Sequence, residues 1–130
     1  MKRAFLDIRD DLINTLAPLG LRVMTFSALA IVVENPDLSQ SQLAQALRIE
    51  RSGVVVLVDE LEKAELISRN QVEGDRRSYA LRATPEGRKL WKQAERRVQA
   101  HEKALLADLS DEEQKHLAEL LSRIGSGVNA

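Results

Sequence analysis

The stretch that decides the fold is residues 38–69, LSQSQLAQALRIERSGVVVLVDELEKAELISR. Ser39 is a favourable N-cap residue, and an apolar stripe follows at helical spacing: Leu43, Ala44 and Leu47. After a break at residues 48–50, a second stripe appears: Val54, Leu57, Val58 and Leu61. Two short helices separated by about three residues are the pattern of a helix-turn-helix. Three successive β-branched residues weaken the second helix, but the apolar spacing outweighs that effect.

A hairpin is predicted directly after this pair of helices. Residues 67–72 and 78–83 have the length of short strands, and the turn between them is centred on Gly74 and Asp75. Such a hairpin converts a helix-turn-helix into a winged helix. Arg76 and Arg77 place positive charge at its tip, where a duplex would attract it. The alternative is a solvated hairpin whose charges form exposed ion pairs of little worth.

Helices are predicted on both sides of this unit. Residues 3–16 carry an apolar stripe, Pro18 and Gly20 interrupt it, and a second helix runs over 22–34 and stops before Pro36. Thr84 caps a long helix over 85–108, with Pro85 at its first position. Ser110 and Glu113 form a capping box for a last helix, and residues 125–130 are a frayed tail. The predicted fold class is mainly α with a small β-hairpin wing.

The length, composition and net charge of the chain limit the classes of protein to which it can belong. A chain of 130 residues suits one domain, and 44% hydrophobic with only 3% aromatic residues predicts an aliphatic core. The net charge of −1 argues against a wholly basic nucleic-acid binder, so any recognition of DNA must be local. Cysteine is absent, acidic residues interrupt the N-terminal segment, and the longest apolar run, residues 28–33, is too short to cross a bilayer. We expect a soluble, cytoplasmic protein without a membrane partner.

The terminal helices have apolar faces that a small winged core cannot cover. A second copy of the chain would bury them, and a two-fold dimer suits a palindromic duplex. The alternative is that these helices fold back as an intramolecular bundle. We therefore expect one domain over 1–130, with a DNA-binding lobe at about 22–84 and dimerisation helices at about 1–18 and 85–125.

Over nearly its whole length, the sequence resembles the MarR family of dimeric winged-helix transcription regulators. The most specific part is Asp75-x-Arg77, followed by Leu81 and by the Thr84-x-x-Gly87 turn. The resemblance implies that Arg77 enters the minor groove and that Asp75 orients it. A nearby carboxylate can hold a guanidinium in one rotamer, and a narrow, electronegative minor groove attracts arginine. Arg76 is expected near a phosphate.

The second helix of the motif is the expected recognition helix. Its first turn carries polar and small residues, and two valines should point outward, where they can contact thymine methyl groups. The residues predicted to contact DNA from the helix-turn-helix are Ser39, Gln40, Arg51, Ser52, Gly53, Val55 and Val56. Two positions where the family usually has glycine are Arg48 and Glu65 here. Each costs up to about 1 kcal/mol if the backbone there is left-handed.

A candidate ligand site is suggested by PLGLRVMTFSAL, residues 18–29. This stretch resembles a branch of the family that often controls the catabolism of aromatic acids. We hypothesise that Arg22, at a helix N-terminus, anchors a ligand carboxylate, with an apolar wall of Leu16, Leu21 and Phe26. The alternative is that Arg22 is solvated or forms an interface salt bridge. No acid and histidine cluster suggests a metal, and His101 and His116 stand alone on separate helices, so no cofactor is expected.

Two other classes of function compete with DNA binding. An enzyme is disfavoured, because the chain has no cysteine, no glycine-rich phosphate loop and no evident pair of acid and base. A winged-helix protein-interaction module is the remaining alternative, and it has no need of Asp75-x-Arg77. The sequence therefore predicts a homodimeric repressor that binds a palindromic double-stranded DNA operator and is released by a small molecule.

Overall fold

The computed structural model describes residues 2–72 and 74–124, without the side chains of residues 75–78. The predicted tail, residues 125–130, lies outside the described residues. The order of elements is the predicted one: α1 (Lys2–Leu16), the 3₁₀ turn η1 (Ala17–Leu19), α2 (Val23–Glu34), α3 (Gln40–Leu47), α4 (Arg51–Lys63), β1 (Ile67–Val72), β2 (Asp75–Ala83), α5 (Pro85–Leu105) and α6 (Asp111–Arg123). The predicted fold class, mainly α with a two-stranded antiparallel wing, is confirmed.

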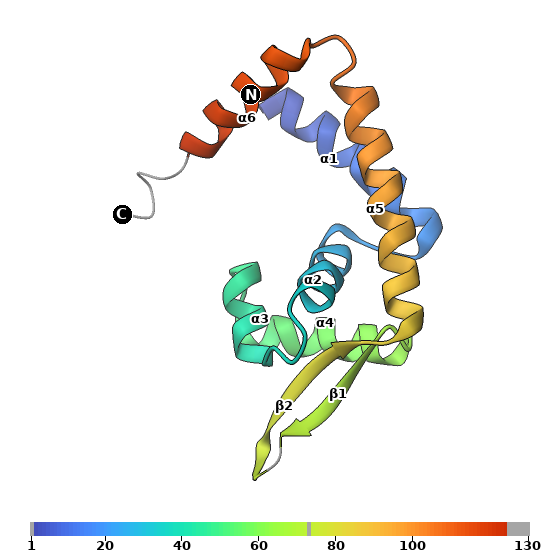
Figure 1. Ribbon diagram of the computed structural model, residues 1–130, viewed down its shortest axis with the longest axis vertical. Helices are drawn as coiled ribbons and strands as arrows, with labels where there is room; N and C mark the ends of the chain where they lie inside the picture. Colours follow the sequence, from blue (N-terminus) through green and yellow to red (C-terminus); the bar gives the residue numbers. More distant parts are fainter. Residues whose placement is uncertain (1, 73, 125–130) are drawn as a thin grey trace.

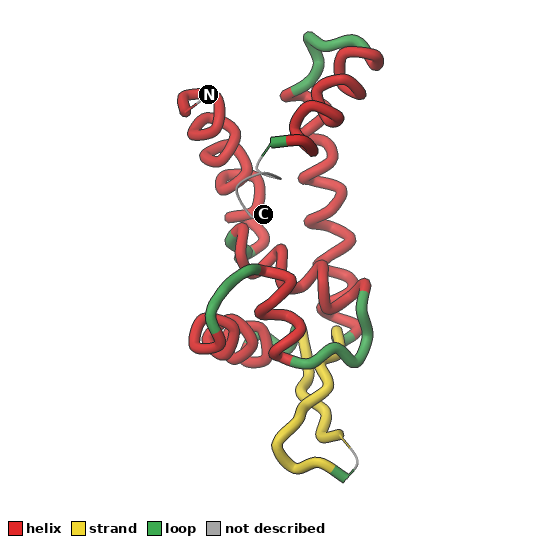
Figure 2. The backbone as a smooth tube through the Cα atoms, turned by 90° about the vertical axis from the view of Figure 1, so that its left-hand side faces the viewer, coloured by secondary structure: helices red, strands yellow, loops and turns green. Residues whose placement is uncertain are grey.

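The long helix α5 joins the two ends of the molecule (Figure 1). One end holds α2, α3, α4 and the hairpin, whose tip projects away from the helices. At the other end, α1 packs alongside α5, and the two helices lie side by side in Figure 2 as well. Helix α6 turns back from the far end of α5 and stands apart from α1 in Figure 2. The DNA-binding motif predicted from the sequence is thus a separate lobe at the base of a helical stalk.

The core of the lobe is aliphatic, as the low aromatic content predicts. Its buried residues come from α2, α3, α4 and both strands, and the largest fully buried side chains among them are Leu29, Leu43, Leu61, Ile67 and Leu81. A smaller cluster of Leu16, Leu21 and Ala94 ties η1 and the end of α1 to α5. Burial of such side chains is the main source of stability in a small domain.

The break between α1 and α2 forms where Pro18 and Gly20 predict it. Gly20 ends the 3₁₀ turn with a left-handed φ of 72°, a conformation that glycine adopts without strain. Within the described residues, no single helix is long and apolar enough to cross a membrane. Lys2–Leu19 and Val23–Glu34 reach the required length and apolar composition only when taken together, and the pair is bent by 69°.

All three predicted N-caps are present. The hydroxyls of Ser39, Thr84 and Ser110 accept hydrogen bonds from the backbone N–H three residues later, at 3.1, 3.0 and 3.2 Å. The backbone N–H of Ser110 donates to the Glu113 carboxylate, which holds the pKa of Glu113 below its usual value. This cap therefore stabilises α6 above the ordinary pKa of a glutamate and is lost as the pH falls through the lowered value.

Several predicted boundaries differ from the structure, three of them for a visible reason. Helix α5 ends at Leu105 and not at residue 108, because the Gln114 amide donates to the carbonyls of Leu106 and Leu109 at 3.2 and 3.1 Å and stabilises a turn there. Strand β2 begins at Asp75 and not at residue 78, because Asp75 pairs with Val72 beyond a register irregularity between Gln71 and Val72. Arg22 is the N-cap of α2 and not its first residue.

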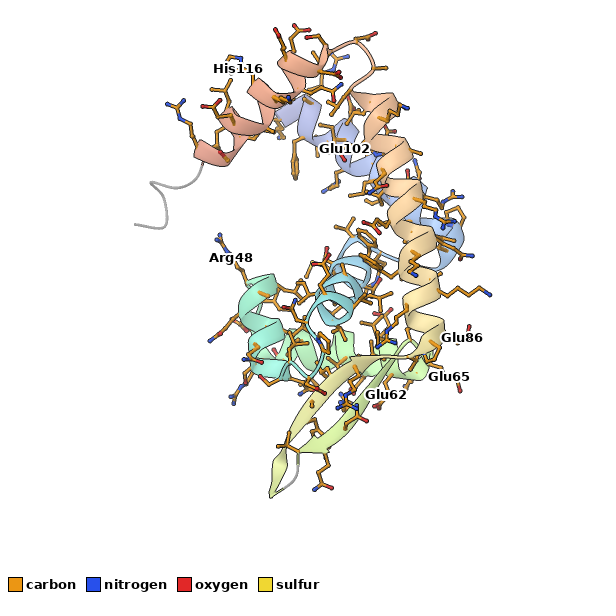
Figure 3. All side chains as sticks on the ribbon, viewed as in Figure 1. Arg48, Glu62, Glu65, Glu86, Glu102 and His116 are labelled. Atoms are coloured by element: carbon orange, nitrogen blue, oxygen red, sulfur yellow. The ribbon has the colours of Figure 1, made fainter. Side chains whose placement is uncertain are left out.

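Arg48 and Glu65 stand at two positions where the family usually has glycine. Both adopt the left-handed backbone that glycine favours, with φ of 56° and 61°. The expected cost of up to about 1 kcal/mol therefore applies at each position. Asp37 is a third non-glycine residue with a left-handed backbone, with φ of 67°, and it was not predicted. Figure 3 shows Arg48 pointing outward from the end of α3 and Glu65 at the junction of α4 with α5, so neither side chain is constrained by the core.

The Thr84-x-x-Gly87 turn attaches α5 to the end of α4. The Thr84 backbone N–H donates to the Leu66 carbonyl at 3.0 Å, and the Thr84 hydroxyl donates to the Glu65 carbonyl at 2.6 Å. Gly87 lies so close that a Cβ atom there would be 1.9 Å from the Leu66 carbonyl oxygen. The glycine of the motif is therefore required by a backbone contact.

We expect Gly87→Ala to lower the free energy of unfolding by about 3 kcal/mol, since the neighbouring atom is backbone and cannot turn aside. The matched control is Gly53→Ala in α4, where the new Cβ would meet only the Ile49 side chain at 3.7 Å. That control should gain about 0.5–1 kcal/mol from its higher helix propensity. Urea denaturation at one protein concentration measures both. Equal midpoints for Gly87→Ala and the parent would contradict the steric argument.

Candidate nucleic-acid interface and adjoining pocket

The outward face of α4 is the one that the sequence predicts. Val55 and Val56 are 40% and 63% exposed, whereas the residues predicted to face the core are buried: Val54, Leu57, Val58 and Leu61. Arg51 and Ser52 are exposed in the first turn, and Gly53 is half-buried beside them. The start of α4 therefore presents a short polar turn followed by an apolar strip.

A groove of about 410 Å³ brings the start of α3, the start of α4 and the wing together. It is lined by Ser39, Gln40, Ser41, Arg51, Val54, Val55 and Tyr79. Four of the predicted DNA-contact residues therefore share one concave surface. Arg51 donates to the Ser41 hydroxyl at 3.3 Å, which directs its guanidinium along the groove. Sequence reasoning missed Ser41 and the exposed Tyr79, because an isolated polar or aromatic residue carries no periodic signal.

Arg69 of β1 fastens the wing to both helices of the motif. Its Nε donates to Gln40 Oε1 at 3.1 Å, its Nη1 donates to Glu62 Oε1 at 3.0 Å, and its Nη2 pairs with Asp59. The Arg69 side chain is only 20% exposed, and Figure 3 shows Glu62 beside the strands. Asp59 and Glu62 are thus neutralised within the lobe. The sequence showed the charge of Arg69, but not which residues it would meet.

The root of the wing is also held by the segment that precedes α3. Leu38 and Leu81 form an isolated antiparallel bridge, in which the Leu81 N–H donates to the Leu38 carbonyl at 2.9 Å. The Arg82 guanidinium bonds to the Asp37 carboxylate beside it, and this hydrogen bond raises the pKa of Arg82 above its ordinary value. A single bridge leaves no pattern in the sequence, so it was not predicted.

The three remaining DNA-contact residues of the prediction lie at the tip of the wing. Asp75, Arg76 and Arg77 begin β2, next to Gly74 with its left-handed φ of 84°. Their side chains are outside the described part of the structure. The backbone places these residues at the end of the hairpin that lies farthest from the helices, as Figure 1 shows. The orienting role of Asp75 stays a prediction.

A second cavity, of about 690 Å³, lies between α1 and the start of α2. It is lined by eight apolar residues and two arginines: Phe5, Ile8, Leu12, Ile13, Ala17, Leu21, Val23 and Met24, with Arg9 and Arg22. Of the predicted ligand residues, Leu21 and Arg22 are in this lining. Leu16 and Phe26 are not, because Leu16 is fully buried in the smaller core and Phe26 packs against it. Their places in the wall are taken by earlier residues of α1: Phe5, Ile8, Leu12 and Ile13.

Arg22 forms an ion pair with Glu60 of α4, 38 residues away along the chain. Its side chain is 60% exposed and that of Glu60 is 48% exposed. The backbone N–H of Arg22 also donates to the Thr25 hydroxyl at 2.8 Å, which fixes the start of α2. Arg22 thus lies in the cavity wall and has a salt-bridge partner within the chain, while its role as a ligand anchor stays a prediction.

The histidines lie apart from both cavities. His101 of α5 is half-buried, with its Nε2 4.0 Å from an Asp11 carboxylate oxygen, and His116 is exposed on α6 (Figure 3). Within residues 2–72 and 74–124, no group of three His, Asp or Glu side chains is arranged to hold a metal ion.

Comparison with known proteins identifies the family. A family profile described as "MarR family" matches residues 19–78. The solved structure of the transcriptional repressor CouR bound to a 23-mer DNA duplex has a TM-score of 0.88 and 33% identity, over 95% of this chain and 87% of that one. The chain belongs to the MarR family. It is a DNA-binding transcription regulator, and the family resemblance found in the sequence is confirmed.

Other relatives show the range of this similarity. CouR from Rhodococcus jostii RHA1 bound to p-coumaroyl-CoA has a TM-score of 0.80 and 31% identity, over 95% of this chain and 87% of that one. A putative transcriptional regulatory protein for the hcr operon of Thauera aromatica is 38% identical over 81% of this chain. The chain spans 63% of the length of that relative. The family protein Rv2887 of Mycobacterium tuberculosis in complex with salicylic acid has a TM-score of 0.75 and 28% identity, over 95% and 92% of the two chains.

We expect Arg69→Ala to lower the free energy of unfolding by about 1–3 kcal/mol, because three polar partners lose a charged donor at once. Arg69→Lys should recover only part of this loss, since an ammonium cannot reach all three partners in the geometry of a guanidinium. Arg82→Ala, which breaks the exposed pair with Asp37, should lose less than Arg69→Ala. Chemical denaturation of the three variants tests this order. An Arg69→Ala protein as stable as the parent would show that the contacts of Arg69 with Gln40, Asp59 and Glu62 do not stabilise the fold.

Proposed function

We propose that this protein is a sequence-specific repressor that acts as a homodimer on a palindromic double-stranded DNA operator and is released by a small anionic aromatic molecule. It would act in the cytoplasm and without catalysis. The observation that supports this most directly is the groove shared by α3, α4 and the wing, on a chain that superposes on DNA-bound CouR with a TM-score of 0.88. The protein-interaction alternative has no comparable support.

The docking that we propose places the first turn of α4 in the major groove. Arg51 and Ser52 supply polar contacts there, and Val55 and Val56 contact thymine methyl groups. Ser39 and Gln40, at the N-terminus of α3, face a phosphate, which a helix N-terminus favours. The wing extends along the duplex, with Arg77 in the minor groove and Arg76 near the backbone. Because the two valines offer no hydrogen bond to a base edge, the wing contributes an unusually large share of the affinity.

The dimer is supported by apolar side chains that the chain leaves exposed on α1 and α6. These are Leu117, Leu120 and Leu121 on α6, with Ile124 directly after it, and on α1 Phe5, Ile8 and Ile13, which also line the cavity beside α1. An exposed apolar surface of this extent marks an association site. A second copy related by a two-fold axis would cover these faces and set two α4 helices for half-sites about one helical turn apart.

The effector is proposed from the cavity beside α1. Its wall is apolar except for Arg9 and Arg22, which suits a flat apolar body with an anionic group. CouR has been solved with p-coumaroyl-CoA and Rv2887 with salicylic acid, so two relatives bind aromatic compounds that carry negative charge. We infer an aromatic carboxylate or its thioester for this chain. The effector releases DNA only to the extent that it binds the released state more tightly.

We expect Arg77→Ala to weaken binding to the duplex upstream of the protein's own gene by about 1–3 kcal/mol. It should also reduce the salt dependence of that binding by about one charge, since a guanidinium leaves the phosphate region. Fluorescence anisotropy with labelled duplex at several salt concentrations measures both effects. Arg88→Ala is the matched control, because Arg88 is exposed on α5 near the lobe but away from the tip.

Two outcomes would count against this proposal. Binding that is equal for the specific and a scrambled duplex would favour the protein-interaction module. Specific binding that is indifferent to Arg77→Ala would keep the regulator but remove the wing arginine from its contacts. Sedimentation at the concentrations used for DNA binding reports whether the active species is the dimer.

We expect salicylate or p-coumaroyl-CoA to raise the melting temperature and to weaken DNA binding. A ligand at 100 times its dissociation constant stabilises the native state by about 2.7 kcal/mol, which is a readily measured shift. Arg22→Gln should bind the active probe more weakly than Arg3→Gln, which removes a charge from α1 outside the cavity lining. If neither probe changes melting temperature or DNA affinity, the effector class is wrong. Equal affinity in both variants would remove Arg22 as the anchor.

A further inference from the structure

The ion pair between Arg22 and Glu60 joins the cavity wall directly to the recognition helix. Arg22 caps α2 and lines the cavity, and Glu60 is in the second half of α4. The other arginine of the wall, Arg9, lies 3.7 Å from the carboxylate of its own neighbour Asp10. Among the ion pairs given for the described residues, the Arg22 pair joins the cavity wall to the recognition helix.

The Arg22–Glu60 ion pair is weak enough for another anion to replace Glu60 as the partner of Arg22. Both side chains are about half exposed, at 60% and 48%, and pairs of that kind contribute little to stability because water and salt screen them. A carboxylate held in the apolar cavity would reach Arg22 from the other side, with less water around it. A guanidinium in that position pairs with whichever anion is held nearest, so Glu60 and a bound anion compete for one partner.

The acids of α4 are divided between two sides of the lobe. Asp59 and Glu62 bond to Arg69 and attach α4 to the wing, whereas Glu60 attaches it to the start of α2. Loss of the Glu60 contact would leave the contacts to the wing intact. Helix α4 and the wing would then shift together relative to α2, which alters the spacing of the two recognition helices in a dimer.

The Arg22–Glu60 pair is formed in this structure, whose backbone superposes on that of CouR bound to a DNA duplex with a TM-score of 0.88. We propose that the Arg22–Glu60 ion pair is the latch of the DNA-binding state, and that the anionic group of the effector opens it by taking Arg22 from Glu60. This inference rests on the proposed function and adds to it the residue of the recognition helix through which release is transmitted.

The first arm of the test needs no ligand. Glu60→Gln should weaken binding to the specific duplex about two- to fivefold, the range that an exposed ion pair can supply. Removal of a negative charge alone would have the opposite effect, so the direction is informative. Glu65→Gln is the matched control, because Glu65 follows α4, is exposed and has no ion pair among the described residues. Melting temperatures verify that both variants are folded.

A double-mutant cycle shows whether the two residues act through each other. Arg22→Gln and Glu60→Gln should each weaken specific binding, and the double variant should be no weaker than Arg22→Gln alone, since the pair is already broken. Additive losses would mean that Glu60 acts independently of Arg22, and the latch would be wrong.

The second arm adds salicylate and, separately, p-coumaroyl-CoA. The probe that acts on the parent should bind Glu60→Gln about two- to fivefold more tightly, because its competitor for Arg22 is gone. The factor by which that probe weakens DNA binding should fall by the same amount, since coupling between two ligands is reciprocal. Isothermal titration and anisotropy measure the two quantities on the same protein.

The outcomes separate this inference from the function on which it rests. A parent that binds no specific duplex, or responds to neither probe, contradicts the proposed function and the latch with it. A parent that binds DNA and responds, while Glu60→Gln behaves like Glu65→Gln in both arms, overturns the latch alone. Weaker DNA binding together with tighter probe binding in Glu60→Gln supports it.

Discussion

The close contact between Gly87 and the Leu66 carbonyl sets the direction of α5, and the rest of the molecule is arranged from it. Because a Cβ atom at this position would overlap the carbonyl oxygen, α5 can start only where no side chain intervenes. Thr84 fixes the same junction by hydrogen bonds to the carbonyl of Glu65 and from the N–H of Gly87. Helix α1 then packs on α5, so the place of the cavity and of the exposed apolar faces follows from a backbone contact at the end of the recognition helix.

Charge is balanced locally, which is how a chain with a net charge of −1 can present a surface to DNA. Helix α4 carries three acids after its first two turns, and each has an arginine partner from another element: Asp59 and Glu62 with Arg69, and Glu60 with Arg22. Arg51 at the start of the helix faces the groove instead, where it bonds to a neutral hydroxyl. The field at the DNA-facing end of the helix is therefore more positive than the net charge indicates.

Local features of the fold could be predicted from the sequence because they depend on neighbouring residues. Ser39, Thr84 and Ser110 cap helices through hydrogen bonds to the backbone N–H three residues later. The apolar stripe of α4 depends only on helical spacing. The Leu38–Leu81 bridge and the partners of Arg69 depend on segments brought together by the core, so no local pattern marks them. The cavity wall shows the same limit. Leu16 and Phe26 have the correct residue type, but Leu16 is buried in the smaller core beside α5 and Phe26 packs against that core, so earlier residues of α1 supply the wall.

The helical period itself explains why one short run of acids can serve two surfaces. Residues three apart share a face of a helix, so Asp59 and Glu62 both point to the wing, where one guanidinium can bind both. Glu60 is one position further than Asp59, which turns it by about 100° around the axis, toward the start of α2. A sequence with its acids at i and i+3 only would bind the wing equally well but would have no charge on the cavity side. The third acid is therefore unnecessary for holding the wing, and its placement is what connects the recognition helix to the wall of the cavity.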